Sequence, residues 1–435
     1  MKICESDNRY VERSSQRSQP MEALNSKPFH AIILGAGPAG TGPLVGAMRQ
    51  GCYKEMLDKG VLWVDPRPTM GAGNIGKYDI DADSAAGVFL ECLEGLNNPL
   101  SALNNHSSAQ VLRMRGTEAP PLPNVGSFLD AVGSFLVDQV NAARESRFIS
   151  GVSATGVAKQ SNGYFTVALS DGSKFEGRRV VFAMGGYQVP ERVITASISP
   201  ELSLGNIVRG PMILTSEIFR EGGVAKMCEL LRVPNARVVI LGSAHSSGSV
   251  VHLVLSAPDL ELGQGSVTWM FRRTPRLMYP SVEAAHSDGY FEFDKTRDVC
   301  PASGRVYRLA GLRMAGREQL RRALGLGGLT PDQRLRMMSL DETSTSDIHR
   351  ILQDATIVVP AFGYRPRTVP VIDENGAPIK LLAEELPQAP MVDRMCRVLD
   401  SEGKPVPNLL GIGLASGFIP HRTHAGWRAE FYRAD

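Results

Sequence analysis

The sequence predicts an α/β protein with two Rossmann-like dinucleotide-binding domains and a β-meander between them. Two stretches predict the domains, because each runs from a short apolar strand through a turn of small residues into a helix. They are residues 30–42, "HAIILGAGPAGTG", and residues 236–255, "ARVVILGSAHSSGSVVHLVL". The meander is predicted by residues 148–190, where apolar segments alternate with the turn sequences "SNG" and "SDG".

The first turn has the spacing of a dinucleotide-binding loop. Gly35 permits a tight turn, Gly37 lets the backbone approach a pyrophosphate, and Gly40 lets the following helix lie close to the strand. Pro38 and Ala39 complete the turn. A pyrophosphate would rest on the helix N-terminus, where free N–H groups and the positive end of the dipole favour an anion.

The neighbouring sequence favours nucleotide binding over the alternative, a purely structural turn. A second strand, "VLWVD", ends at Asp65, whose carboxylate is placed to accept hydrogen bonds from the ribose hydroxyls of an adenine nucleotide. Strand, turn, helix, strand and acid therefore follow in the expected order. One residue departs from the pattern, since Pro43 lies early in the expected helix and could kink its first turns.

The second turn is less glycine-rich than the first. Only Gly242 stands at one of the three glycine positions, and Ser243, His245 and Ser246 supply the small and polar character of the turn. The strand that follows, "SVTWMFRRTP", supports the same nucleotide-binding interpretation.

Two arginines replace the acidic residue after this strand. Arg272 and Arg273 occupy the position that Asp65 has in the first domain. A guanidinium there suits a 2′-phosphate through paired, charge-assisted hydrogen bonds, so the second nucleotide is expected to be NADPH rather than NADH. The alternative is a solvated surface pair of arginines.

Composition excludes several other classes. At 435 residues the chain has room for two or three domains, and its formal net charge of +2 gives no reason to expect nucleic acid or a membrane surface as a partner. Its apolar stretches fall short of the roughly 20 residues that a spanning helix needs. Six scattered cysteines without a CxxC pair indicate a reducing compartment, so we expect a cytoplasmic protein without a bound metal.

Three further segments complete a family pattern. "AMGGY" at 183–187 and "AFGYRP" at 361–366 each follow an apolar strand, and "NLLGIGLASG" at 408–417 contains Gly413. The chain resembles the two-dinucleotide-domain flavoproteins, which include flavin-containing and N-hydroxylating monooxygenases and pyridine nucleotide-disulfide reductases. The resemblance implies that an NADPH domain is inserted in an FAD domain, that the first two segments mark the two crossings, and that the third passes near the flavin.

The resemblance also implies domain boundaries. Residues 1–28 are expected to be a disordered tail, because they are polar and lack the apolar core of a secretory signal. Residues 29–205 would form the first part of the FAD-binding domain, residues 206–345 the NADPH-binding domain, and residues 346–435 the return segment of the FAD domain.

The sequence narrows the chemistry within this superfamily. Disulfide reductases need two neighbouring cysteines beside the flavin, and no such pair occurs here. The FxGxxxHxxx fingerprint of Baeyer–Villiger and flavin-containing monooxygenases is also absent. The N-hydroxylases are the most similar subgroup, because their NADPH turn tends to be small and hydroxyl-rich like "GSAHSSGS".

The resemblance thus implies an FAD- and NADPH-dependent oxidoreductase, favouring a monooxygenase that acts on a small organic substrate. Two alternatives stay open: a flavin reductase or dehydrogenase that inserts no oxygen, and a non-catalytic flavin-binding regulator. No catalytic side chain is predicted, since the flavin carries the difficult step in this class. Homo-oligomerisation is left open.

Four remaining stretches have more than one interpretation. Residues 71–93, with Tyr78, Asp79 and Asp81, either face the substrate or form caps and turns. Residues 124–144 have the apolar spacing of a core-facing helix. Residues 278–313 are either a lid or a surface elaboration or oligomer contact. "HRTH" at 421–424 is expected at the surface or in a pocket rather than on a metal.

Overall fold

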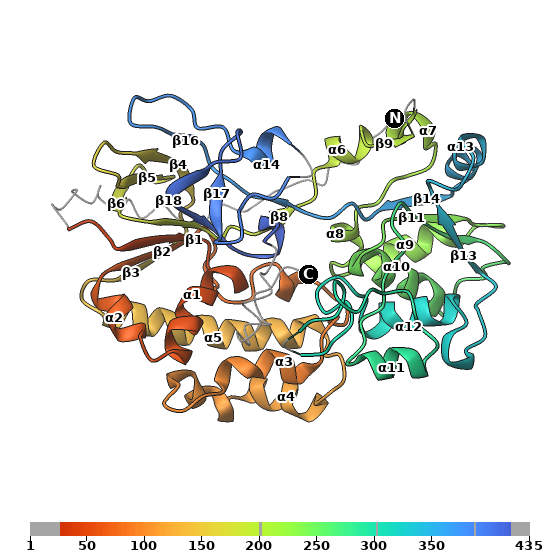
Figure 1. Cartoon of the computed structure of the whole chain (residues 1–435), viewed down its shortest axis with the longest axis horizontal. Coiled ribbons are helices and arrows are strands. Elements are labelled where there is room, and N and C mark those ends of the chain that lie inside the picture. The colour runs from red at the N-terminus through yellow and green to blue at the C-terminus, as the bar shows by residue number, and fades with distance from the viewer. Residues whose placement is uncertain (1–26, 200–201, 302, 387–388, 419–435) are drawn as a thin grey trace.

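The computed structural model describes residues 27–418, with gaps at 200–201, 302 and 387–388. The expected tail 1–28 therefore lies outside the described residues except for its last two, and so does the "HRTH" stretch. The described chain forms two α/β units that lie side by side (Figure 1). The N-terminal unit is on the left of that view and the second unit on the right.

The first unit is built on a six-stranded sheet in the order β17-β18-β7-β1-β2-β3. All neighbouring strands in it are parallel except β17 and β18. The strands are β1 (Ala31–Leu34), β2 (Val61–Asp65), β3 (Arg147–Ser150), β7 (Val180–Phe182), β17 (Arg397–Leu399) and β18 (Pro405–Gly411). Both β1 and β2 are buried throughout, as their unbroken apolar runs predict.

Helices cover one face of this sheet. They are α1 (Pro38–Arg49), α2 (Tyr53–Asp58), α3 (Ala86–Leu90), α4 (Ser107–Arg115) and α5 (Leu122–Ala142), with short 3-10 turns η1 (Ile75–Lys77), η2 (Glu91–Leu93) and η3 (Pro99–Asn105). The helix predicted at 124–144 is confirmed as α5, whose apolar stripe packs against Ile33 and Trp63 of the sheet. The helix α1 continues through Pro43 without a break.

The predicted meander covers the opposite face of the first sheet. Strands β4 (Ala154–Lys159), β5 (Phe165–Leu169) and β6 (Lys174–Gly177) pair antiparallel, and β16 (Val371–Ile372) joins β4 in parallel. Because successive side chains of a strand point to opposite faces, Ile32 and Leu34 of β1 pack here while Ile33 packs against the helices.

The second unit has a four-stranded parallel sheet in the order β13-β12-β11-β14. Its strands are β11 (Val238–Leu241), β12 (Val267–Phe271), β13 (Leu335–Ser339) and β14 (Ile357–Pro360). The strand β14 lies beyond residue 345, within the segment that was expected to return to the first unit. This sheet therefore takes one strand from that segment.

Helices pack on both faces of the second sheet. Those in this part of the chain are α6 (Pro190–Ile194), α7 (Leu204–Ile207), α8 (Thr215–Ile218), α9 (Gly223–Leu231), α10 (His245–Ser256), α11 (Val282–Ser287), α12 (Met314–Ala323) and α13 (Thr345–Gln353), with the 3-10 turn η4 (Leu326–Gly328). Apolar residues of α10 and α12 share one core with the sheet, and those of α7 and α13 share the core on the other face.

Two small ladders lie near the connections between the units. Strands β8 (Gly186–Tyr187) and β15 (Arg365–Pro366) pair antiparallel, and β9 (Ser197–Ser199) pairs with β10 (Leu202–Ser203). The helix α14 (Leu382–Glu385) and the 3-10 turn η5 (Leu414–Ser416) belong to the return segment. The predicted crossing segments "AMGGY" and "AFGYRP" thus meet in the β8–β15 pair, which places both connections together.

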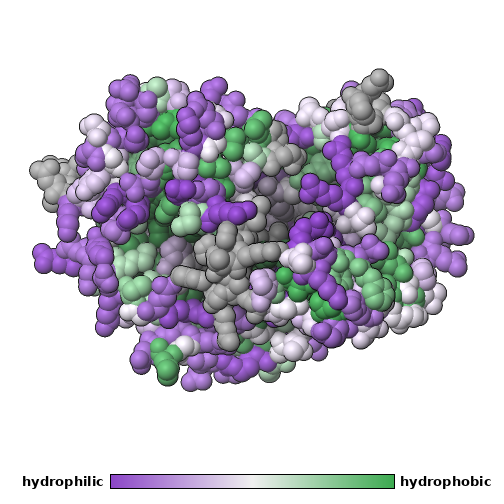
Figure 2. All heavy atoms as spheres, viewed as in Figure 1, coloured by the Kyte–Doolittle hydropathy of each residue, from purple (hydrophilic) through white to green (hydrophobic). Residues whose placement is uncertain are grey.

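The outer surface is mostly polar on the face shown in Figure 2, where purple residues predominate and green residues form scattered groups. No helix among the described residues combines the length and apolar character needed to cross a bilayer.

Candidate functional site

The first glycine turn is held from two sides. Gly35 has a positive φ of 108°, which favours glycine, and a Cβ there would lie 2.3 Å from the carbonyl oxygen of Ala183. The indole Nε1 of Trp63 donates a hydrogen bond of 2.9 Å to the Gly35 carbonyl. The segment after β7 and the strand β2 therefore fix the turn from which α1 starts.

The second turn repeats this arrangement. Gly242 has a φ of 133°, and a Cβ there would lie 2.6 Å from the carbonyl oxygen of Ala361. The indole Nε1 of Trp269 donates a hydrogen bond of 2.7 Å to the Gly242 carbonyl. Both tryptophans are the third residue of their strand, so each unit uses one indole to clamp its turn.

The loop after β2 and the Arg67 side chain form a cradle over Gly37. A Cβ on Gly37 would lie 3.4 Å from the Cα of Gly73 and 3.7 Å from Nη2 of Arg67. Gly73 is held there because the preceding loop packs on α5, where a Cβ on Gly71 would lie 1.9 Å from the carbonyl oxygen of Leu129. The turn, the loop and a guanidinium thus surround one small space at the start of α1.

Asp65 lies at the end of β2 as expected, but its carboxylate is 1% exposed and already has several donors. Its Oδ2 accepts 2.6 Å from the Ala36 N–H, and its Oδ1 accepts 2.9 Å from the Arg67 N–H. The Arg67 guanidinium adds bonds of 3.1 Å and 3.3 Å. The carboxylate therefore fixes the turn and orients the Arg67 side chain. Ribose hydroxyls, the predicted partners of Asp65, would have to compete with these donors.

The other residues predicted for the first turn lie together. Pro38 is the first residue of α1, and a Cβ on Gly40 would lie 1.8 Å from the Gly35 carbonyl oxygen, so the helix closely approaches the strand. Gly413 lies against the same turn, because a Cβ on it would lie 2.9 Å from the Cβ of Ala39. The fold thus brings the late segment 408–417 to the start of α1.

Of the residues predicted in the second turn, His245 has the most informative surroundings. Its Nδ1 lies 3.3 Å from Oδ2 of Asp83, while its Nε2 is buried without a hydrogen-bond partner among the described residues. Burial lowers the pKa of His245 against the opposing charge of Asp83; Arg313 lowers it further, and a hydrogen bond with the Gly311 backbone acts to raise it. Ser243 and Ser246 are half-buried in the same turn.

Arg272 and Arg273 directly follow β12, at the sheet edge where Gly242 follows β11. Both side chains are exposed. Nη2 of Arg272 donates 2.6 Å to the carbonyl oxygen of Ser197, which leaves the rest of that guanidinium available.

The stretch 71–93 reaches the second unit. The Tyr78 and Tyr364 hydroxyls lie 3.2 Å apart, and the Asp79 N–H donates 2.7 Å to the carbonyl oxygen of Phe219. Burial raises the pKa of Tyr364. Asp81 forms an isolated bridge with Pro121, and its charge acts to raise the pKa of His252 in α10 against the larger, opposing effect of burial. Asp81 therefore also lies near the second unit.

The described residues contain no cluster of side chains suited to hold a metal ion. The five described cysteines are free, and burial raises the pKa of Cys92 to about 12 and that of Cys396 to about 11. Raised values disfavour the thiolate that redox chemistry requires.

Sequence reasoning missed Trp63, Trp269, Arg67 and Gly73. The matching position of the two tryptophans in their strands is a signal that was present in the sequence. Arg67 and Gly73 carried no such signal, because their approach to Gly37 depends on how the loop packs against α5.

Comparison with known proteins gives one close match in sequence. The chain is 32% identical over 364 residues to CMP-5'-(3-aminopropyl)phosphonate hydroxylase from Streptomyces rubellomurinus, and the match covers 81% of each protein. A scan against models of known protein families gives no match.

Solved structures show a weaker likeness. A flavin-containing monooxygenase from Stenotrophomonas maltophilia has a TM-score of 0.47 at 15% identity, covering 90% of this chain and 92% of the other. A cyclohexanone monooxygenase from Rhodococcus sp. Phi1, bound to NADP+, has a TM-score of 0.44 at 17% identity, covering 89% and 80%.

Two parallel sheets, each with a clamped small-residue turn after its first strand, define a protein of the two-dinucleotide-binding class. Within that class, the chain belongs to the family of flavin-dependent monooxygenases that its hydroxylase relative represents. It is therefore a flavin-dependent monooxygenase, which confirms the favoured expectation over the reductase and regulator alternatives.

Proposed function

We propose that this enzyme uses FAD and NADPH to hydroxylate the amine nitrogen of a small substrate that also carries a phosphonate or phosphate group. The observation that carries the proposal is the 32% identity, across 81% of both chains, to a hydroxylase of CMP-5'-(3-aminopropyl)phosphonate. The name of that compound contains both a primary amine and a phosphonate. The hydroxyl-rich turn at Gly242, similar to that of N-hydroxylases, supports nitrogen as the target.

We assign the two cofactors to the two units. The first unit, which comprises the chain before α6 and the return segment after β14, would bind FAD at the Gly35 turn. The chain from α6 to β14 would form the inserted NADPH unit, since α6, α7 and α13 share a core with its sheet. The support is that each turn stands at the carboxyl end of its sheet's strands, where open α/β sheets bind ligands.

The residues of the first turn fit a dinucleotide. The cradle over Gly37 would be filled by a Cβ, as expected where a pyrophosphate must approach the backbone. Arg67 has its guanidinium at this cradle and is 31% exposed, so we propose that Arg67 contacts the pyrophosphate and that Asp65 holds Arg67 in place. Gly413, against Ala39, would lie beside the flavin end of the cofactor.

The second turn has the groups that NADPH needs. Gly242 with Ser243, His245 and Ser246 would cradle its pyrophosphate at the N-terminus of α10. The exposed guanidinium groups of Arg272 and Arg273 would receive the 2′-phosphate. His245 stands at the start of α10 with its Nδ1 facing the Asp83 carboxylate, so we propose that it helps to orient this turn toward the nucleotide.

The overall reaction balances as amine, O2, NADPH and a proton giving hydroxylamine, NADP+ and water. When bound, flavin takes the hydride from NADPH and activates O2 for transfer to the nucleophilic amine. The protein's contribution is to align the two nucleotides, hold the substrate by its anionic group and keep water from the reacting centre.

The proposal is tested with the purified enzyme loaded with FAD. Anaerobic NADPH should bleach the flavin absorbance faster than NADH does. In air, CMP-5'-(3-aminopropyl)phosphonate should then give a product heavier by one oxygen atom, while the matched propylphosphonate compound without the amine gives none. Equal oxygenation of the compound without the amine would refute nitrogen as the target.

A further inference from the structure

Three arginines gather where the two units connect. Arg365 and Arg367 lie two residues apart along the extended β15 segment, so their side chains share one face. Burial lowers the pKa of Arg365, and the positive charge of Arg192 in the nearby helix α6 lowers it further. We call Arg192, Arg365 and Arg367 the crossing arginines.

The aromatic ring of Tyr187 forms part of the same surface. Tyr187 lies opposite Arg365 in the β8–β15 pair, and the guanidinium carbon of Arg367 stands 4.7 Å from the centre of its ring. The Arg367 N–H also donates 2.9 Å to the carbonyl oxygen of Gly185, which extends the ladder by one bond. The backbone of both strands therefore fixes this face.

No carboxylate among the described residues pairs with the crossing arginines. Arg365 donates to the backbone carbonyl oxygens of Ala383 and Leu386, and Arg192 leaves its buried Nη1 without a partner. The nearby acids are engaged elsewhere: Glu384 accepts 2.5 Å from the Thr368 hydroxyl, and Glu385 lies 3.5 Å from Lys380.

Such an arrangement costs stability. Arg192 and Arg365 are partly buried, whereas Arg367 is exposed. Two partly buried cations that repel each other and lack a counter-ion are unfavourable, and removing water from a guanidinium without replacing its hydrogen bonds adds to the cost. Guanidinium groups bind phosphate and phosphonate oxygens through paired, charge-assisted hydrogen bonds, so a bound dianion would remove both penalties.

The place of the cluster in the fold suits a ligand of this enzyme. Tyr364, whose hydroxyl meets Tyr78, directly precedes Arg365. On the β8 strand, a Cβ on Gly186 would lie 2.6 Å from the Cβ of Ala415. Ala415 is in η5, which directly follows Gly413. The crossing arginines thus adjoin both the junction of the units and the predicted flavin segment.

We propose that the crossing arginines form a binding site for a phosphate or phosphonate dianion. The inference rests on the proposed function, which supplies two sources of this group: the anionic end of the substrate and the phosphates of NADPH. In either case Arg192 is the best residue to test. Its buried Nη1 has no hydrogen-bond partner among the described residues of the free protein, and a bound anion would offset its repulsion of Arg365.

The test compares Arg192→Gln with Arg144→Gln in the full-length protein, since the Arg144 side chain is 96% exposed. Without ligand, Arg192→Gln should melt at the same temperature as the parent or higher. Inorganic phosphate should raise the melting temperature of the parent and of Arg144→Gln, whereas Arg192→Gln should bind phosphate about tenfold more weakly or worse. An equal response to phosphate in all three proteins would overturn the proposal, and so would a large loss of stability without ligand.

Two further measurements distinguish the source of the dianion. If the substrate supplies it, Arg192→Gln raises the KM for the phosphonate substrate and leaves the preference of flavin reduction for NADPH over NADH unchanged. If NADPH supplies it, that preference falls instead. Hydroxylation with neither change would refute this inference alone, while phosphate binding without any hydroxylation of aminophosphonates would refute the proposed function alone.

Discussion

Asp65 acts on the candidate site through two neighbours, the Ala36 N–H and the Arg67 guanidinium. A buried carboxylate with these two donors fixes the position of both the turn and the Arg67 guanidinium, so loss of the carboxylate would disturb both. The glycines at 35, 37 and 40 could be predicted because their spacing is local. The role of Arg67 could not, since it depends on a loop that packs against a distant helix.

Arg67→Gln should weaken FAD binding about ten- to a hundredfold, because it removes a charge-assisted contact to the pyrophosphate. Gly37→Val should abolish binding, since its side chain would fill the cradle, while Gly46→Ala on the same helix meets no atom within 4 Å and should have no effect. Fluorescence titration of the apoprotein with FAD measures all three. If Arg67→Gln bound FAD with unchanged affinity, Arg67 would not contact the cofactor, and the predicted contact of Asp65 with the ribose would be favoured instead.

Replacing Arg272 and Arg273 by Ala should weaken NADPH far more than NADH, by roughly 2 to 4 kcal/mol, because only NADPH has the 2′-phosphate. The affinities follow from the NADPH and NADH dependence of anaerobic flavin reduction. Since Arg272 also bonds the Ser197 carbonyl, Arg273→Ala alone separates nucleotide binding from support of β9. Equal losses for both nucleotides in Arg273→Ala would mean that this arginine does not read the phosphate.

Cys92→Ser and Cys300→Ser should each leave NADPH-dependent flavin reduction within about tenfold of the parent, roughly 1.4 kcal/mol in barrier. Burial raises the pKa of Cys92 to about 12, so a reactive thiolate is disfavoured there. Stopped-flow reduction with FAD bound is the measurement. Loss of reduction in either variant, with a charge-transfer band in the reduced parent, would indicate thiol chemistry.

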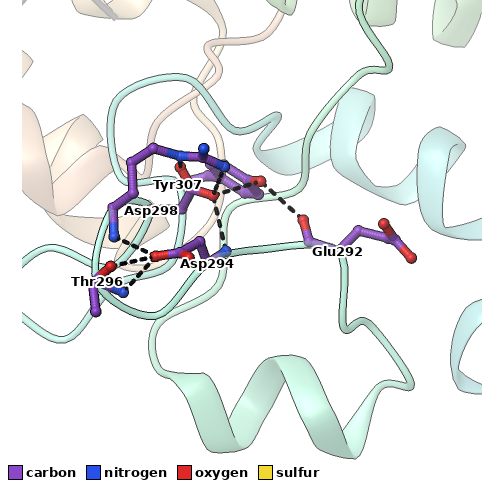
Figure 3. A network of polar contacts seen from close by, with 6 residues as sticks. Glu292, Asp294, Thr296, Asp298 and Tyr307 are labelled. Carbon is purple, nitrogen blue, oxygen red and sulfur yellow. Dashed lines mark hydrogen bonds and ion pairs between the residues drawn. The ribbon is translucent and has the colours of Figure 1, made fainter.

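At the scale of elements, the stretch 278–313 contributes to the core of the second unit. Tyr279 and Tyr290 are buried and stacked, and Leu312 is fully buried beside them. The outer part of the stretch is tied by a local network in which the Tyr307 hydroxyl donates to Asp298 and to the Glu292 carbonyl oxygen (Figure 3). These contacts give the stretch a structural role in the second unit.

The ion pair between Asp288 and Arg321 anchors this stretch to α12, and its side chains are only 10% and 21% exposed. Hydrogen bonds from Arg321 hold the pKa of Asp288 below its ordinary value, despite opposing desolvation. A lowered folded-state pKa adds stability above the unfolded pKa of about 3.9, and this contribution is lost as pH falls through the folded value.

Asp288→Asn should therefore lower the free energy of unfolding by about 2 kcal/mol near neutral pH, because it weakens the charge-assisted hydrogen bonds of the less exposed pair and leaves Arg321 with Glu318 as its only ion-pair partner among the described residues. The gap to the parent should shrink as the pH falls below about 4. Denaturant unfolding across pH checks both. Asp347→Asn, which breaks an exposed pair with Arg350, is the control and should cost less than about 1 kcal/mol. A pH-independent gap would assign the loss to packing.

At the scale of the whole molecule, the two parallel sheets, the meander and α5 could be predicted, because each follows from periodicity and turn residues within one stretch of sequence. The meeting of β8 with β15 and the transfer of β14 to the second sheet could not, since both depend on residues far apart in the chain. The crossing arginines belong to this second kind, since Arg192 precedes β11 in the chain while Arg365 and Arg367 follow β14. The proposed function at the junction therefore depends on contacts between residues that are far apart in the chain.

We propose that the enzyme inserts one atom of O2 into an amine and consumes one NADPH in doing so. The most direct measurement is turnover of CMP-5'-(3-aminopropyl)phosphonate under ¹⁸O₂, with NADPH consumption and product mass followed together. We predict one labelled oxygen in each product molecule, matched to one NADPH, and a hydroxylamine at the propyl nitrogen. Oxidation of NADPH that yields only hydrogen peroxide, or a product oxygen that comes from water, would contradict the account.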